Sequence, residues 1–314
     1  MDSQISVKNM LEELLAISHP LTPFDMPLLD AHGATLAEDI SLGDRLVLAK
    51  GTRIRSQQIG LAASLGLSNL PTQPHPRVVI ISAGDGLIEP GLELEGDDQE
   101  FETNSWMLAT AAKEAGALSY RVHAIPDNAQ ELKDVVEDQL VRADLIVISG
   151  ESHDGSYALI EQVLRDMGEV KSALPTLQGS SRHCFGLIGE DKTPVVVLPG
   201  DSISAFISFE LFVRPMIRTM LGVKNVFRST VKAHISADVE SPIGQTSLLC
   251  ATLSGGVNTS LGRGTGSDLY AEVLPDQNQM YTLAAAHALV TIPADSPGYL
   301  RDEEADVIIL DRAF

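Results

Sequence analysis

Short continuous runs of apolar residues mark the middle of the chain, at residues 78–82, 145–149 and 195–198. A strand that is covered on both faces has this pattern, because neither face meets water. Between the runs, apolar side chains recur every three or four positions, which predicts amphipathic helices. The predicted helices cover residues 104–115, 128–140 and 157–167, and a further strand is predicted over residues 119–125.

The last apolar run continues into a turn and a long helical pattern. Pro199, Gly200 and Asp201 form the turn, and either Asp201 or Ser202 can cap the helix that follows. The N-terminus of this helix opens beside the end of the strand, where unpaired N–H groups attract anions. An ordinary strand-turn-helix unit has the same pattern, so the stretch alone does not identify a site.

Strands that alternate with helices favour an α/β fold with a parallel sheet and right-handed crossovers. Ligands of such sheets bind beyond the carboxyl ends of the strands. The loops predicted to converge there are residues 83–91, 151–156 and 199–202.

The beginning of the chain has a different pattern. It predicts a helix capped by Ser6, several short extended pieces, and a second helix from Ser56 that ends at Gly66. A proline cluster then stiffens the chain at residues 71–76, and we place a domain boundary there. The first region is therefore residues 1–75, and the α/β domain is residues 76–223.

Residues 224–314 are rich in β-forming residues. Predicted strands at residues 226–235, 246–252 and 307–311 are separated by glycine-containing turns, which favours a small β-barrel or sandwich. The predicted turns are residues 254–256, 262–266 and 295–298.

Composition narrows the classes of function. The 314 residues include 22 Lys and Arg but 43 Asp and Glu, a net charge of −21, which argues against nucleic-acid binding. We find no apolar run near the roughly 20 residues of a membrane span and no signal-peptide pattern. Cys184 and Cys250 lack metal or redox spacing and are interpreted as buried thiols of a cytoplasmic protein.

Several short motifs occur in an order that resembles one family, the molybdopterin molybdenumtransferases, which include the E domain of gephyrin. Residues 82–85 (SAGD) look like the family's S-T-G-D, and residues 102–105 (ETNS) look like its D-S-N-S. Residues 199–202 (PGDS) resemble P-G-N-P. Ser149-Gly150 with Gly155 and Tyr157 resembles S-G-G-V-S-V-G-D-Y-D, and residues 50–66 and 209–215 are also similar to family segments.

The resemblance implies a molybdopterin-binding α/β domain, a small N-terminal α+β region, a C-terminal β-barrel-like domain and a homodimer. Family members insert molybdate into adenylylated molybdopterin with release of AMP, using acidic residues and magnesium. The matched positions imply a set of residues that bind the cofactor. They are Ser82, Asp85, Asn104, Ser149, Gly150, Gly155, Pro199, Gly200 and Asp201.

The sequence departs from the family where that chemistry needs charge. The family's inserted N-terminal domain is missing, because Ile40 leads almost directly to Arg45. Its two acidic loop positions are Ser156 and Ala158, and Gln178 to Arg182 replaces its K-P-G-K-P segment. We therefore assign no catalytic or metal-binding residue, expect no magnesium site, and interpret His153 and His183 as polar loop residues.

Three functions remain open at this point. The chain can be an enzyme of molybdenum-cofactor assembly that acts on another pterin intermediate, or a molybdopterin binder that has lost insertase activity. It can also be a non-catalytic dimeric scaffold that binds a protein partner, as gephyrin does. The substitutions favour loss of insertion, and they do not show what replaced it.

Overall fold

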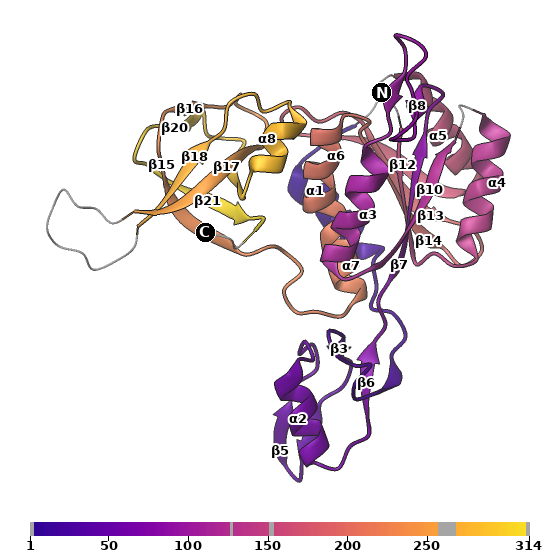
Figure 1. Ribbon diagram of the computed structural model, residues 1–314, viewed down its shortest axis with the longest axis vertical. Helices are drawn as coiled ribbons and strands as arrows, with labels where there is room; N and C mark the ends of the chain where they lie inside the picture. Colours follow the sequence, from indigo (N-terminus) through magenta and orange to yellow (C-terminus); the bar gives the residue numbers. More distant parts are fainter. Residues whose placement is uncertain (1–2, 126–127, 151–153, 257–267, 312–314) are drawn as a thin grey trace, which may run out of the picture.

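A seven-stranded sheet forms the centre of the computed structural model, which describes residues 3–125, 128–150, 154–256 and 268–311. A β-barrel lies on one side of this sheet and a small N-terminal unit hangs below it (Figure 1). The strand order is β1-β12-β13-β14-β11-β7-β10. The strands are β1 (Ser3–Ile5), β7 (Arg77–Ala83), β10 (Leu118–Ile125), β11 (Leu145–Ser149), β12 (Gly168–Pro175), β13 (His183–Ile188) and β14 (Thr193–Leu198).

The three apolar runs are neighbouring parallel strands, as predicted. β11 lies between β7 and β14 and pairs with both in parallel. One face of the sheet is covered by α1 (Val7–Ala16), α3 (Asn104–Ala115) and the helical segment after β14, and the other by α4 (Ala129–Leu140) and α5 (Asp154–Met167). The α/β assignment is therefore confirmed.

The sheet is mixed rather than wholly parallel, which corrects the prediction. β13 runs antiparallel to both β12 and β14. The sequence of β12 mixes charged and apolar residues, because it is only partly buried, and its pattern is weaker than that of the central strands. His183 belongs to β13 and is fully buried, so its interpretation as a loop residue was wrong.

The first residues of the chain join the central sheet. β1 pairs with β12, and Met10 and Leu14 of α1 are buried in the same core as α3. Residues 3–16 thus pack with the α/β unit, although the sequence analysis grouped them with residues 17–75.

The helix after β14 has three parts: α6 (Ser202–Ser208), the π-helical segment η1 (Phe209–Val213) and α7 (Arg214–Met220). Pro215 has no N–H to donate to the carbonyl four residues earlier, which loosens the α-helical pattern at this point. The predicted apolar face is retained, and Phe209, Met216 and Ile217 are fully buried.

The N-terminal unit has a small core of its own. Its elements are β2 (Phe24–Pro27), β3 (Thr35–Leu36), β4 (Ile40–Leu42), β5 (Arg45–Leu48), α2 (Ser56–Ser64) and β6 (Asn69–Gln73). β4 and β5 form a tight hairpin, and Gly43 in its turn has a φ of 62°. This turn stands where the resemblance places the family's inserted domain.

The C-terminal unit is a closed five-stranded barrel, which confirms the barrel prediction. Its strands are β15 (Thr230–Ile235), β17 (Ser247–Gly256), β18 (Asp268–Val273), β19 (Ala288–Ile292) and β21 (Glu304–Ile309), with α8 (Met280–Ala285) and the pair β16 (Val239–Glu240) and β20 (Gly298–Tyr299) beside it. Residues 254–256, predicted as a turn, belong to β17 and pair with β18. The predicted turn at residues 262–266 lies outside the described residues. Over the described part of the chain, no helix is both long and apolar enough to cross a membrane.

Candidate ligand site

A small polar pocket lies where β7, β11 and β14 end. Its cavity is about 50 Å³, and four of the nine residues predicted for the site line it: Ser82, Asn104, Gly150 and Gly200. Pockets that enclose a whole small ligand are usually about 300–1,000 Å³, so this one has room for no more than a terminal group of such a ligand. The other lining residues are Leu87, Glu100, Phe101, Glu102, Thr103 and Ser202.

Asn104 connects the strand ends from the first turn of α3. Its Nδ2 donates to Ser149 Oγ at 2.8 Å and to the Gly200 carbonyl at 2.6 Å. Ser149 Oγ in turn donates to the Pro199 carbonyl at 3.2 Å. Asn104 is 7% exposed, and its Oδ1 is buried without a hydrogen-bond partner. A buried unpaired acceptor is destabilising by about 1–3 kcal/mol, so this oxygen is suited to a donor supplied by a ligand.

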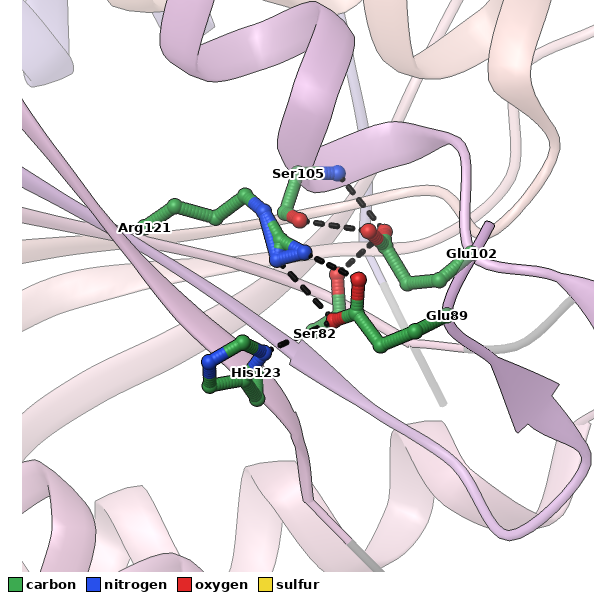
Figure 2. A network of polar contacts seen from close by, with 6 residues as sticks. All are labelled: Ser82, Glu89, Glu102, Ser105, Arg121 and His123. Atoms are coloured by element: carbon green, nitrogen blue, oxygen red, sulfur yellow. Dashed lines mark hydrogen bonds and ion pairs between the residues drawn. The ribbon is translucent and has the colours of Figure 1, made fainter. Parts of the chain in front are cut away.

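Glu102 is a site residue that the sequence analysis missed. Its carboxylate is 1% exposed and accepts three hydrogen bonds, from Ser82 Oγ at 2.7 Å, Ser105 N at 2.7 Å and Ser105 Oγ at 2.5 Å. Figure 2 shows these contacts at the start of α3. An acid two residues before a helix that begins with Asn-Ser was the signal, because the first N–H groups of a helix need acceptors.

Three of the predicted residues have other roles or positions. Asp201 is exposed and caps α6, accepting from Ser204 N at 2.8 Å. Pro199 contributes only its carbonyl, and Asp85 lies exposed in the turn between β7 and β8 (Leu87–Ile88), outside the pocket lining. Gly155 is the second residue of α5, and its surroundings lie outside the described residues.

A second polar cluster holds Glu89, in the segment between Leu87 and Glu100, two residues that line the pocket. Arg121 of β10 makes a bidentate ion pair with Glu89, and His123 Nδ1 lies 3.0 Å from Glu89 Oε1 (Figure 2). Burial raises the pKa of Glu89, but hydrogen bonds from Arg121 and His123 outweigh it and lower that pKa overall. The guanidinium also stacks on Trp106 of α3 at 4.0 Å. Arg121 therefore links the β10 edge, α3 and the loop before β9 (Glu100–Phe101).

The charges needed to hold two anions are sparse around the pocket. Gln178, at one family lysine position, accepts a hydrogen bond from Ser247 Oγ. Arg182 Nη1 lies 3.9 Å from Glu161 Oε2. Within the part of the chain that the structure describes, no group of three or more His, Cys, Asp or Glu side chains could hold a metal ion.

Comparisons with known proteins agree with this geometry. Residues 79–219 match the family model described as a probable molybdopterin binding domain. Molybdopterin molybdenumtransferase 1 of Mycobacterium tuberculosis is 30% identical over 279 residues, which is 87% of this chain and 63% of that protein. Molybdopterin molybdenumtransferase 2 of the same organism is 32% identical over 265 residues, covering 82% and 62%.

The chain belongs to the molybdopterin molybdenumtransferase-like family. It spans less than two thirds of the length of these two relatives. The fold of this family member is also that of a molybdopterin biosynthesis MoeA protein from Pyrococcus horikoshii, with a TM-score of 0.80 at 18% identity over 98% of this chain and 100% of that one. A molybdopterin biosynthesis moeA protein from Pyrococcus horikoshii OT3 gives a TM-score of 0.78 at 20% identity.

Proposed function

We propose that this chain binds a molybdopterin-type ligand in molybdenum-cofactor biosynthesis and does not itself insert molybdate. The observation that carries the proposal is the polar pocket at the ends of the parallel strands, lined by Asn104, whose Oδ1 is buried without a hydrogen-bond partner. The match of residues 79–219 to a molybdopterin binding domain supports the same ligand class.

The lining suggests which part of the ligand enters. Glu100 and Glu102 line the pocket, and none of the described lining residues is a lysine or arginine. A phosphate would meet repulsion there, whereas the N–H groups on the edge of a pterin ring would meet acceptors, including Asn104 Oδ1. The pterin edge therefore enters the pocket, and the phosphate end remains at the rim.

The missing charges support the absence of insertion. Insertion brings an oxyanion to a phosphorylated ligand, and two anions need compensating cations to lie together. Gln178 and Ser181 stand where family members have lysines, and the removal of a charge-assisted hydrogen bond costs about 1.5–3 kcal/mol. Ser156 and Ala158 replace two acids, and neither side chain substitutes for a carboxylate on a hard cation such as magnesium.

Binding is tested by exposing the purified chain to molybdopterin without oxygen, removing free ligand, and quantifying retained pterin by its fluorescence after oxidation. The proposal expects retained pterin that is lost in Asn104→Ala. Absence of retained pterin in the wild-type chain would rule out the proposed binding of molybdopterin.

A second candidate function is a scaffold for a protein partner, and a groove on the barrel side favours it. The groove has a volume of about 1030 Å³ and exposes Ile243 at 73% and Leu300 at 63%. Acidic side chains at Asp238, Glu303 and Glu304 stand among its lining residues, so a basic segment with apolar anchors fits it best. Saturable binding of such a peptide, removed by Leu300→Asp without loss of folding, is the test.

A further inference from the structure

A cleft between the N-terminal unit and the α/β unit gathers cations. Its cavity is about 260 Å³ and is lined by Arg53, Lys113 and Arg218, with His75 beside them. Arg53 comes from the loop before α2, Lys113 from the end of α3, and Arg218 from α7. Lys224 lies against the turn at Gly51, next to the same loop.

These cations lack acidic partners in a chain that has a large excess of acids. The chain has 43 Asp and Glu against 22 Lys and Arg, and about half of its cations form an ion pair, as Arg77, Arg121 and Arg228 do. No ion pair involves Arg53, Lys113 or Arg218 among the described residues. Glu114 is the one acid among the described lining residues, and its carboxylate lies 3.6 Å from Arg228.

Helix ends explain only part of this cluster. Lys113 and Arg218 lie in the last turns of α3 and α7, where the helix dipole favours cations. Arg53 is outside any helix, and its charge acts on Arg218. Burial, and secondarily the charge of Arg53, lower the pKa of Arg218, so an anion between the two would remove an unfavourable interaction.

A hydrogen bond and close packing fix the walls of the cleft. His75 Nδ1 donates to the Gly116 carbonyl at 2.6 Å, which ties the segment before β7 to the end of α3. Gly116 has a φ of 106°, and a Cβ there would lie 2.7 Å from Leu221 Cδ1. Lys113 and Arg218 are thus held on packed helices, and Arg53 faces them from the loop before α2.

We propose that this cleft binds a phosphate group, either free or carried by a small monoester. Guanidinium groups hold phosphate oxygens through paired hydrogen bonds, and the lysine adds a point charge. The cavity has room for more than one phosphate, which admits the carbon skeleton of a monoester. The cleft is separate from the pocket at Asn104, so this proposal stands independently of the proposed function.

Isothermal titration of the full chain with inorganic phosphate and with glycerol 3-phosphate, at low ionic strength, tests the site. We expect saturable binding that weakens with added salt. Arg53→Gln and Arg218→Gln should each weaken it by about ten-fold or more, as expected when a charge-assisted hydrogen bond is removed. Tighter binding of glycerol 3-phosphate than of phosphate would identify a monoester as the natural form, and the reverse would identify free phosphate.

Lys133→Gln is the matched control, because it removes one positive charge on α4, which covers the other face of the sheet. This change should not alter phosphate affinity. Arg53 and Lys113 are exposed, so their variants report on binding even if Arg218→Gln folds poorly. Absence of saturable binding, or equal weakening by Lys133→Gln, would overturn the proposal.

Discussion

Asn104 carries the clearest residue-scale consequence of the site. Asn104→Ala removes the ligand acceptor together with two hydrogen bonds, to Ser149 and Gly200. We expect pterin retention to fall by about ten-fold or more, with stability lowered by about 1–3 kcal/mol. Asn128→Ala is the control, because Asn128 caps α4 and its loss costs about 1 kcal/mol of stability without touching the pocket. Equal pterin retention in the two variants would remove Asn104 from the site.

His183 predicts a pH dependence of stability. Its Nδ1–H donates to the Ser181 carbonyl at 3.0 Å and its Nε2 accepts from Ser208 Oγ at 2.9 Å, which holds the buried ring neutral. Burial lowers the pKa of His183 to about 4, while the hydrogen bond to Ser181 opposes this effect. Because the unfolded chain takes up the proton near pH 6.5, stability is complete above pH 6.5 and is lost as the pH falls toward 4.

The loss amounts to about 3 kcal/mol at most, from 1.36 kcal/mol per pKa unit. Urea unfolding of wild type and His183→Gln at pH 7 and pH 4.5 measures it. The variant should be less stable at pH 7 and show a smaller drop on acidification. An equal drop in both proteins would mean that His183 does not stay neutral.

At the scale of single residues, the sequence predicted where the site lies more accurately than it predicted the hydrogen bonds within the site. Ser82, Asn104, Gly150 and Gly200 were predicted and line one pocket. Glu102 was missed because its role depends on Ser82, which reaches it only when β7 ends beside the start of α3. Asp201 offered two interpretations, and the capping one holds because Ser204 N lies within 2.8 Å of its carboxylate.

At the scale of elements, the feature to test is the pair of contacts that Arg121 makes with Glu89 and Trp106. Arg121→Gln removes the guanidinium that pairs with Glu89 and stacks on Trp106. The wall of the pocket should loosen, so we expect weaker pterin retention and stronger acrylamide quenching of Trp106, the single tryptophan. Arg142→Gln is the control, because Arg142 stacks on Tyr120 at 4.7 Å away from the loop. Quenching that rises equally in both variants would contradict the role of Arg121 in holding Glu89 and Trp106.

The central strands of the sheet were predictable because both of their faces are buried. Burial alone was not sufficient, since β13 and β19 are mostly buried and were not predicted. β7, β11 and β14 are buried on both faces, and their sequences contain little besides Val, Ile and Leu. β12 and β18 were missed because their positions are only partly buried, which leaves polar residues in the pattern. The π-helical segment depends on packing around Pro215, and periodicity alone does not report it.

At the scale of the whole molecule, we propose a homodimer. The N-terminal unit has a core of six buried side chains, namely Ala31, Leu36, Leu48, Ile54, Ala62 and Leu70. So small a core gains stability from further contacts, and a stable interface buries about 1,200–2,000 Å² in total. Light scattering at micromolar concentration should give twice the chain mass of 33.6 kDa. A mass of one chain would exclude the dimer.

The central claim is that this family member binds molybdopterin without inserting molybdate. The most direct measurement supplies the purified chain with adenylylated molybdopterin, molybdate and magnesium, and follows AMP release together with formation of active cofactor. A full-length molybdopterin molybdenumtransferase serves as the positive control in the same assay. We expect AMP release at background with pterin retained on the protein. AMP release and cofactor formation comparable to the control would contradict the account.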